Sequence, residues 1–410
     1  MSRTAGEKNR WRWLWIAAGV LAIVVAAAVA GWAIFVHDSR PDAPGAFYRA
    51  RSPLPDGPPG TIIRSEVIAG FHSGATAHRV LYKSTGYDGE PTAVSGLIVV
   101  PDGTPPAGAR KIVAYTHGTV GVASDCAPSL VTNQEQQPLL FEGGGELLAA
   151  GYVVAASDYQ GLGTPGPHPY LVGDSEAMNE LDIVRAAQNL SEAQAGNEFV
   201  VWGHSQGGHA SLFTGQLAAG YAPELELVGV AAGGPVPNLK DLFKVNIKTT
   251  VGKVLISMAL QSWAEVYDDA SLDQIATPVA RPLIGRIAKN CLYTKRQILA
   301  SVPGSLALNL TFLHTPPWET EPWATILENN NPGATRTNAP LLIIQGDADP
   351  IVAPDVTARL VDKLCAEGES VELRVLEGTA HLDAGHVAVP DVVQWIADRF
   401  AGKPAPTTCT

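Results

Sequence analysis

The sequence predicts an α/β fold in which a mostly parallel sheet carries helices on both faces, with a helical segment inserted before the last strands. Short apolar runs alternate with helical segments over residues 111–232 and again over residues 340–400, which is typical of a parallel sheet. A Gly-x-Ser-x-Gly pentapeptide at residues 203–207 falls between one such strand and the next helix. The alternation stops at residues 235–331, where the chain is helical, apolar and punctuated by prolines.

The individual elements follow from local patterns. Residues 61–68, 78–83 and 92–100 are predicted to be extended, and the turn signal Tyr87-Asp88-Gly89 indicates a hairpin at one sheet edge. The alternating part predicts strands at residues 111–115, 152–157, 199–202 and 227–232, and helices ending at residue 150 and spanning residues 174–190 and 205–219. After the insertion come strands at residues 341–344 and 371–376, followed by a closing helix at residues 390–400.

These elements define the expected domains. The core comprises residues 61–234 and 332–402, and residues 403–410 form a short tail. Residues 235–331 are predicted to be a helical cap that lies over the ends of the strands, because apolar stripes occur at residues 253–260 and 306–313. A second ordinary helical layer of the core is the alternative interpretation.

The N-terminal 36 residues are predicted to be separate from the folded domain. Leu14–Val36 carries no charge and exceeds the length of about 20 residues that a membrane-spanning helix needs. Positive charges at residues 3, 8, 10 and 12 should keep the preceding flank in the cytoplasm, so the rest of the chain is exported. The segment is expected to be a transmembrane signal anchor, and a signal peptide cleaved after Ala30 is the alternative. Residues 37–60 then form a Pro- and Gly-rich linker.

The length, net charge and cysteine content of the chain exclude some classes of function. The chain has 410 residues, is 46% hydrophobic and carries a formal net charge of −12. A chain of this length can bury a large core, and its acidic balance without basic runs argues against a nucleic-acid partner. The four cysteines, Cys126, Cys291, Cys365 and Cys409, contain no CxxC pair, so a zinc site is not expected. In an exported protein an even number suggests disulfides, with three connectivities open, and four buried thiols are the alternative.

Ser205 is the predicted nucleophile. It lies in Gly203-His204-Ser205-Gln206-Gly207, between the apolar strand 199–202 and a helix of small and apolar residues. A strand, a sharp turn and a helix are the context that a nucleophile elbow requires, because glycines two residues before and after the serine let the two backbones pass closely.

A serine hydroxyl needs a base to take its proton and a carboxylate to orient that base. In α/β proteins whose serine lies on such an elbow, the acid and then the histidine follow the serine along the chain, each on a loop after a strand. Asp349 is preferred over Asp347 as the acid because it lies farther past the end of the strand 341–344. His381 is preferred over His386 as the base because it follows the strand 371–376 more closely.

Two backbone donors should hold the oxyanion of a tetrahedral intermediate. The N–H of Gln206 is one, and the loop after strand 111–115 should supply the other, with Thr119 preferred over Gly118. His117 is expected to brace this loop. His204 and His209 have no metal-ligand spacing and are assigned to packing or to the pocket lining, so no metal is expected at them.

With these residues identified, the chain resembles the secretory lipase family of fungi and actinobacteria, typified by the Candida lipase A-like enzymes, over roughly residues 60–402. The resemblance implies an α/β-hydrolase core with a helical cap, lipase or carboxylesterase activity without a cofactor, and a triad of Ser205, Asp349 and His381. It also implies disulfides joining Cys126 to Cys291 and Cys365 to Cys409. The motifs that carry it are Tyr115-Thr116-His117-Gly118-Thr119, Asp125-Cys126-Ala127-Pro128-Ser129, Asp158-Tyr159-Gln160-Gly161-Leu162-Gly163, His168-Pro169-Tyr170, Asp182-Ile183-Val184-Arg185-Ala186, Gly203-His204-Ser205-Gln206-Gly207-Gly208, Trp323 with Asn331-Pro332-Gly333, Asp349-Pro350-Ile351-Val352 and Ala380-His381-Leu382.

The sequence therefore predicts a serine-dependent hydrolase of lipid esters, located outside the cytoplasm and either anchored or secreted. An acyltransferase with the same triad is one alternative, because both reactions share the acyl-enzyme. A non-catalytic binding protein of the same fold is the other. The pattern leaves acyl-chain preference and oligomeric state open.

Overall fold

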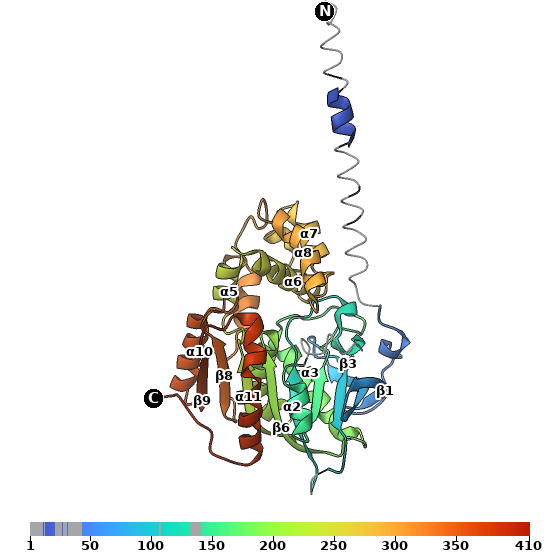
Figure 1. Cartoon of the computed structure of the whole chain (residues 1–410), viewed down its shortest axis with the longest axis vertical. Coiled ribbons are helices and arrows are strands. Elements are labelled where there is room, and N and C mark those ends of the chain that lie inside the picture. The colour runs from blue at the N-terminus through green and yellow to red at the C-terminus, as the bar shows by residue number, and fades with distance from the viewer. Residues whose placement is uncertain are drawn as a thin grey trace, which may run out of the picture. The chain divides into compact units, whose positions relative to one another are not determined.

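Figure 1 shows a computed structural model of the chain. It describes residues 43–105, 108–131 and 141–410, together with a few positions between residues 11 and 31. Residues 1–40 and 41–410 form two compact units, and the fold below is that of the second. The predicted anchor at Leu14–Val36 falls largely outside the described residues. Among those that are described, no helix is both long and apolar enough to cross a membrane.

A nine-stranded sheet forms the centre of the fold and confirms the predicted α/β class. Its strands are β1 (Ile62–His72), β2 (Ala75–Thr85), β3 (Pro91–Pro101), β4 (Arg110–Thr116), β5 (Val153–Ser157), β6 (Ala195–His204), β7 (Glu226–Gly233), β8 (Leu341–Gly346) and β9 (Val371–Leu376). They lie in the order β1-β2-β3-β5-β4-β6-β7-β8-β9. The pairs from β1 to β5 are antiparallel, and all pairs from β5 to β9 are parallel.

Both faces of the parallel strands are apolar because each face is covered by helices. Along β4, Ile112 contributes to the hydrophobic core on one face and Val113 to the core on the other. The same alternation holds in β6, where Phe199 and Trp202 belong to opposite faces. Successive residues point to opposite faces, and both faces are buried, so these strands appear in the sequence as continuous apolar runs.

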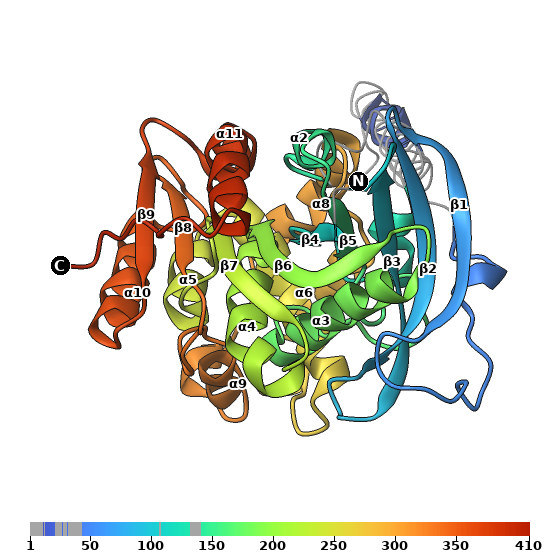
Figure 2. The same cartoon turned by 90° about the horizontal axis from the view of Figure 1, so that it is seen from below.

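Figure 2 shows the helices on the two sides of the sheet. One face is covered by α3 (Gly173–Asn189), α4 (Gln206–Tyr221) and α10 (Pro354–Ala366), and the other by α2 (Gly144–Ala149) and α11 (His381–Phe400). The helix α11 corrects one expectation, because it begins at His381 and not at Pro390. Pro390 lies inside the helix, although proline favours the first helical position. A proline inside a helix removes one backbone hydrogen bond. The helix nevertheless continues through Pro390 because one of its faces is buried against the sheet, the face formed by Ala384, Ala388, Val392, Trp395 and Ile396.

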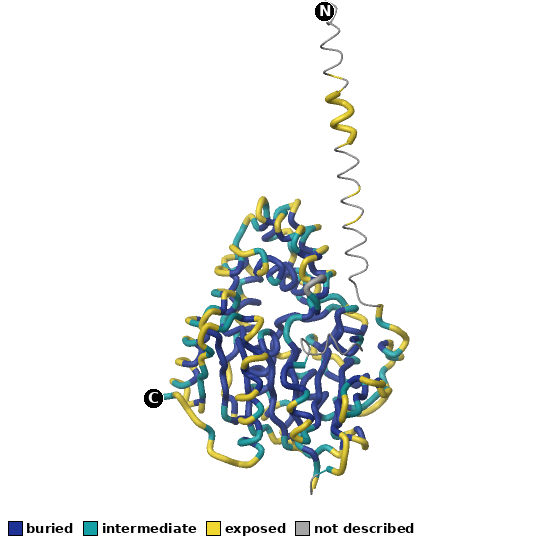
Figure 3. Tube along the Cα trace, viewed as in Figure 1, coloured by how far each residue is buried: buried dark blue, intermediate teal, exposed yellow. Residues whose placement is uncertain are grey.

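Between β7 and β8 the chain folds into α5 (Leu239–Asn246), α6 (Thr250–Val266), α7 (Ala280–Ile287), α8 (Lys295–Ala307) and α9 (Trp323–Asn329). These helices lie at one end of the sheet (Figure 1), and Figure 3 shows buried residues inside this layer as well as along the strands. Trp263 of α6 is fully buried, stacks on Phe243 at 5.6 Å, and donates its indole N–H to the carbonyl oxygen of Tyr170. The helical segment therefore has its own core, which also holds the loop before α3. The cap boundaries at residues 235 and 331 stay a prediction.

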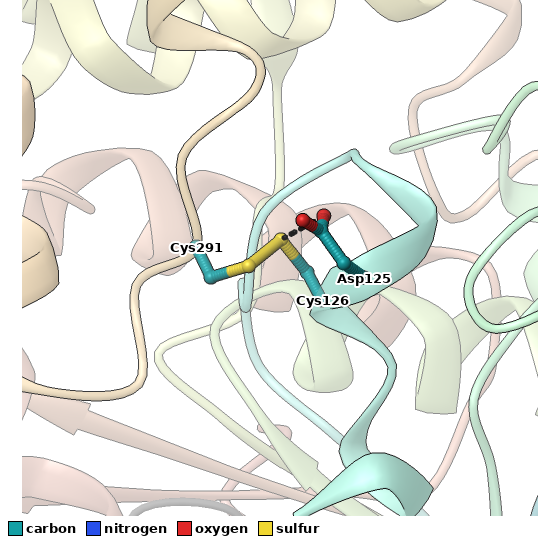
Figure 4. A group of neighbouring side chains, drawn as sticks. All are labelled: Asp125, Cys126 and Cys291. Carbon is teal, nitrogen blue, oxygen red and sulfur yellow. Dashed lines mark hydrogen bonds between the residues drawn. A yellow bond between two sulfur atoms is a disulfide. The ribbon is translucent and has the colours of Figure 1, made fainter. Parts of the chain in front are cut away.

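Both disulfides implied by the family resemblance are present. Cys126 is bonded to Cys291, and Cys365 is bonded to Cys409 near the C-terminus. Figure 4 shows the first disulfide with the carboxylate of Asp125 beside it, 3.9 Å from the Cys126 sulfur. These three residues are the one group of potential metal ligands that lie close together within the described parts of the chain. Because both sulfurs are consumed by the disulfide, neither is available as a thiolate.

Removing the Cys126–Cys291 disulfide is expected to lower the free energy of unfolding. The bond joins residues 165 positions apart, and the loss of this constraint on the unfolded chain is worth up to about 5 kcal/mol. The double variant Cys126→Ala/Cys291→Ala should show this as a lower urea midpoint, followed by tryptophan fluorescence. The variant for comparison is Cys365→Ala/Cys409→Ala. It removes a disulfide between residues only 44 positions apart, so the free energy of unfolding should fall by up to about 4 kcal/mol. An unchanged midpoint in the first variant would contradict the prediction.

Candidate active site

Ser205 lies at the turn between β6 and α4 and has strained backbone angles, with φ of 60° and ψ of −119°. A non-glycine residue with positive φ is uncommon, and such strain concentrates at functional sites. The two glycines are required here by close packing. A Cβ on Gly203 would lie 2.0 Å from the hydroxyl oxygen of Thr116, and one on Gly207 would lie 2.0 Å from the Thr116 carbonyl oxygen. The elbow is thus pressed against the end of β4.

His381, the first residue of α11, faces this serine. Its Nε2 lies 2.8 Å from Ser205 Oγ, and only 3% of the residue is exposed. His386, the competing histidine, is exposed on the same helix. The structure therefore brings the preferred histidine, and not its rival, to the predicted nucleophile.

Asp349 completes a continuous chain of hydrogen bonds. One carboxylate oxygen accepts from His381 Nδ1 at 2.6 Å, and the other accepts from the N–H groups of Ile351 and Val352, both at 2.8 Å. Asp349 is buried. Asp347 is exposed and accepts the N–H of Gly378 at 2.6 Å, so it holds the turn after β9. The structure thus brings Asp349, and not Asp347, to His381, and the assignment of Asp349 as the acid stays a prediction.

Two backbone N–H groups in the segments next to Ser205 have no hydrogen-bond partner among the described residues. Gln206 is the first residue of α4, where helix geometry leaves the N–H unpaired. The N–H of Thr119 likewise donates to no other described group, and the Thr119 hydroxyl is paired with that of Tyr170 at 2.8 Å. A Cβ on Gly118 would lie 3.3 Å from the carbonyl oxygen of His204 and 4.0 Å from Ser205 Cβ, so this loop runs next to the elbow. The arrangement suits a pair of oxyanion donors.

A buried network behind the elbow escaped the sequence analysis. Glu176 of α3 is fully buried, accepts the side-chain amide of Gln206 at 2.7 Å and lies 2.9 Å from His209 Nδ1. The other ring nitrogen of His209 donates to the carbonyl oxygen of Asn330 at 2.9 Å. Asn330 follows α9, so the network ties the elbow to the inserted helices. No sequence signal separates Glu176 from the other acids of α3, because only the tertiary fold turns it toward the elbow.

Three further histidines near the site are buried, and burial disfavours their charged form. Burial lowers the pKa of His117 to about 4, and its two nitrogens contact the carbonyl oxygens of Gly118 and Asp158. It braces the loop, in keeping with the role expected from the sequence. Burial also lowers the pKa of His168 to about 3, and it holds the pKa of His204 well below its ordinary value. His204 packs against His381 with ring centroids 4.7 Å apart.

Neutral burial of His168 predicts acid sensitivity. Its folded-state pKa of about 3 lies below the ordinary value of 6.5, so between these values the unfolded chain binds a proton that the folded chain does not. The stabilisation is complete above pH 6.5 and is lost as the pH falls toward 3. His168→Asn keeps a donor for the Gln160 carbonyl oxygen, now 2.9 Å from Nδ1, and removes the titration. Between pH 6.5 and 4.5, the free energy of unfolding should fall by about 2 kcal/mol more in the wild type than in this variant. The measurement is urea unfolding of both proteins at each of the two pH values. An equal loss of unfolding free energy in the wild type and in His168→Asn would refute the prediction.

A narrow cavity of about 50 Å³ opens beside Ser205. Its wall is mostly apolar and is formed by α5, α6 and the loop after Asp349, with Thr119, Tyr170 and Asn246 as its other polar members. A largely apolar pocket with a few polar groups is typical of small-molecule sites. An ester whose carbonyl reached Ser205 could place one substituent there.

Comparisons with known proteins identify the family of the chain. A family model described as "Secretory lipase" matches residues 145–408. "Lipase A" of Arthroderma benhamiae is 25% identical over 390 residues, which cover 88% of this chain and 80% of that protein. A secreted triacylglycerol lipase of Malassezia globosa is 25% identical over 397 residues, covering 89% and 80% of the two chains. A Mycobacterium tuberculosis protein named "Probable inactive lipase" is also 25% identical, over 84% of this chain and 79% of its own.

Solved structures show the same fold. The crystal structure of Candida antarctica lipase A superimposes with a TM-score of 0.75 at 21% identity and covers 89% of this chain and 87% of its own. The ligand-bound rice cell wall degrading esterase of Xanthomonas oryzae gives a TM-score of 0.68 at 21% identity, over 84% of this chain and 98% of its own. At these identities the likeness concerns the fold alone.

Proposed function

The chain belongs to the secretory lipase family, and from that premise we propose that it is a serine-dependent lipase or carboxylesterase. Its substrates would be acylglycerols or other lipid esters. The observation that carries the proposal is the unbroken hydrogen-bond chain from Ser205 through His381 to Asp349. A family member that had lost its activity by losing one of these three side chains would lack this series of hydrogen bonds.

In the proposed reaction, Ser205 Oγ attacks the ester carbonyl while His381 Nε2 takes its proton. Asp349 holds the imidazole by its Nδ1–H and stabilises the imidazolium that forms. The N–H groups of Gln206 and Thr119 hold the oxyanion. The protonated histidine then gives its proton to the leaving alcohol, and water, activated by the same histidine, releases the acid from the acyl-enzyme.

The test is release of p-nitrophenol from butyrate, octanoate and palmitate esters by residues 43–410, combined with trapping by a fluorophosphonate. We expect hydrolysis, and mass spectrometry should locate the phosphonyl group on the peptide that contains Ser205. Faster hydrolysis of the long chains would favour a lipase over a short-chain esterase. Absence of both turnover and labelling would contradict the proposal and favour a non-catalytic binding protein.

Labelling of Ser205 without hydrolysis would instead indicate acyl transfer. The acyl-enzyme is common to both reactions, so product analysis in the presence of a competing alcohol separates them. Retention of the acyl group on the alcohol, at the expense of free acid, would identify an acyltransferase.

We also propose an extracytoplasmic location, supported by membership of a secretory family and by the two disulfides. The uncharged stretch Leu14–Val36 with its positive flank supports an uncleaved anchor. Cell fractionation of the full chain tests this, since an anchored protein stays with the membrane pellet after a carbonate wash. Recovery of a shortened chain from the medium would support the cleaved form.

A further inference from the structure

The helix α8 has an inverted distribution of polar and apolar side chains. Its exposed large apolar side chains are those of Ile298, Leu299 and Leu306, and the two leucines are 54% and 51% exposed. Its buried polar side chains are those of Gln297, Ser301 and Ser305. A helix on the surface of a soluble protein ordinarily shows the opposite pattern, because its apolar stripe faces the core. The described part of the chain therefore leaves the apolar face of α8 exposed.

Contacts with α7 hold the polar face of α8 inward. Asn290, which follows α7, donates its side-chain N–H to the hydroxyl of Ser301 at 3.0 Å. A Cβ added to Gly304 would lie 3.0 Å from the side chain of Ile287, so the two helices touch at this point. Rotating α8 to bury its leucines would break both contacts. The exposure of the apolar face is thus fixed by the packing of α8 on α7.

The apolar face continues past the end of α8. The N–H of Leu310 donates to the carbonyl oxygen of Ala307 at 3.1 Å, which places Leu310 one turn beyond Leu306, and Leu310 is 91% exposed. Figure 1 shows α7 and α8 at the outer end of the helical segment, and Figure 3 shows exposed residues along this end. The exposed apolar residues, here named the α8 surface, are Ile298, Leu299, Leu306 and Leu310.

The segment that carries the α8 surface is basic, although the protein is acidic. Residues 274–318 contain five lysine or arginine residues and no aspartate or glutamate, whereas the whole chain has a formal net charge of −12. One of the five, Arg281, is paired with Asp273. Arg286 and Lys289 are exposed and have no ion-pair partner among the described residues. Positive charge is therefore available next to the apolar face.

The combination of an apolar helix face with adjacent positive charge specifies what can cover it. A nucleic acid would pair with the positive charges but would leave the leucines uncovered. An uncharged apolar partner would cover the leucines without using the charges. A lipid layer with anionic headgroups matches both features, because the acyl chains cover apolar side chains and the headgroups attract lysine and arginine.

We propose that the α8 surface docks on a lipid layer with anionic headgroups, with α8 lying in the plane of the interface. In this orientation the leucines enter the boundary between headgroups and acyl chains, and Arg286 and Lys289 face the headgroup phosphates. The inference goes beyond the proposed function, because docking of this kind requires neither Ser205 nor an ester bond.

Sedimentation with vesicles tests the docking apart from catalysis. The vesicles are made of ether-linked phospholipids, which contain no carboxylic ester, and consist of phosphatidylcholine alone or mixed with phosphatidylglycerol. Residues 41–410 are used, because they form a compact unit and the apolar stretch Leu14–Val36 would itself enter the vesicles. We expect the partition coefficient to be at least about tenfold higher for the anionic vesicles and to fall as salt is added.

Two double variants separate the apolar from the charged contribution. Leu299→Gln/Leu306→Gln keeps good helix formers but removes apolar area, so the partition coefficient should fall by at least about tenfold. Arg286→Gln/Lys289→Gln should lower partition into anionic vesicles by on the order of twentyfold and weaken its salt dependence.

Each variant has a matched control outside residues 274–318. Val67→Gln/Val387→Gln removes two apolar side chains of similar exposure, 61% and 52%. Arg49→Gln/Lys363→Gln changes the net charge by the same amount at two exposed positions. Both control variants should bind the anionic vesicles as the wild type does.

Several results would overturn the proposal. These are no binding of the wild type to anionic vesicles, equal binding to both kinds of vesicle, and a loss in the controls as large as in the α8 variants. A dimer in solution that disappears in Leu299→Gln/Leu306→Gln, without vesicle binding, would assign the surface to a second copy of the chain. If this variant does not fold, Leu310→Gln replaces it, because that side chain is almost fully exposed. Ester hydrolysis is measured separately, so failure of the docking leaves the proposed function untouched.

Discussion

Ser205→Ala is expected to abolish ester hydrolysis, with kcat lower by a factor of about 10⁶. The substitution removes the only atom that would form the acyl-enzyme, and His381 then has no hydroxyl within its 2.8 Å hydrogen bond. Stability should change little, because alanine meets the same positive φ as serine and the lost hydroxyl lies at a partly exposed position. The measurement is p-nitrophenyl butyrate turnover at saturating substrate, with the melting temperature of each protein.

The matched control for this variant is Ser191→Ala. Ser191 is exposed and bonds only to its neighbour Glu192 in the described structure, so its loss should leave turnover unchanged. Residual activity in Ser205→Ala, well above the rate in water, would still be compatible with the proposal, because oxyanion donors act without the nucleophile. Wild-type kcat in Ser205→Ala would exclude Ser205 as the nucleophile.

Asp349→Asn is expected to lower kcat by a factor of about 10⁴. An amide keeps the shape of the carboxylate and can still accept the N–H groups of Ile351 and Val352. It no longer stabilises the imidazolium, and its N–H favours the wrong tautomer of His381. The loss should therefore appear in kcat with little change in the free energy of unfolding.

Asp347→Asn is the control that decides between the two aspartates. Asp347 accepts the N–H of Gly378 in an exposed turn, and asparagine keeps that bond. Its kcat should stay within about twofold of the wild type. The assignment of Asp349 as the acid is lost if the two variants exchange their effects, or if both lose activity equally.

The sequence predicted those parts of the protein that depend on local pattern. The sheet class followed from apolar runs alternating with helices, because parallel strands are buried on both faces. The elbow followed from two glycines around Ser205, since only glycine fits where β6 and α4 pass the end of β4. The choice of Asp349 over Asp347 needed only the position of each residue relative to the end of β8. The predicted start of α11 at residue 390 was wrong, because the helix already begins at His381 and burial of its apolar face outweighs the N–H that Pro390 lacks.

The remaining features arise where distant segments meet. Glu176 is one acid among several on α3, and its role becomes visible only when Gln206 and His209 pack against it. Asn246 is an ordinary polar residue at the end of a helix until α5 folds onto the loop after β8, where its side-chain amide donates to the carbonyl oxygen of Ile351. The sequence by itself determined the fold class and the residues proposed for the chemistry, because spacing along the chain encodes strands, helices and the elbow. The tertiary structure alone decided which side chains support them and which residues line the cavity beside Ser205, because burial and hydrogen bonding depend on residues far apart in the chain.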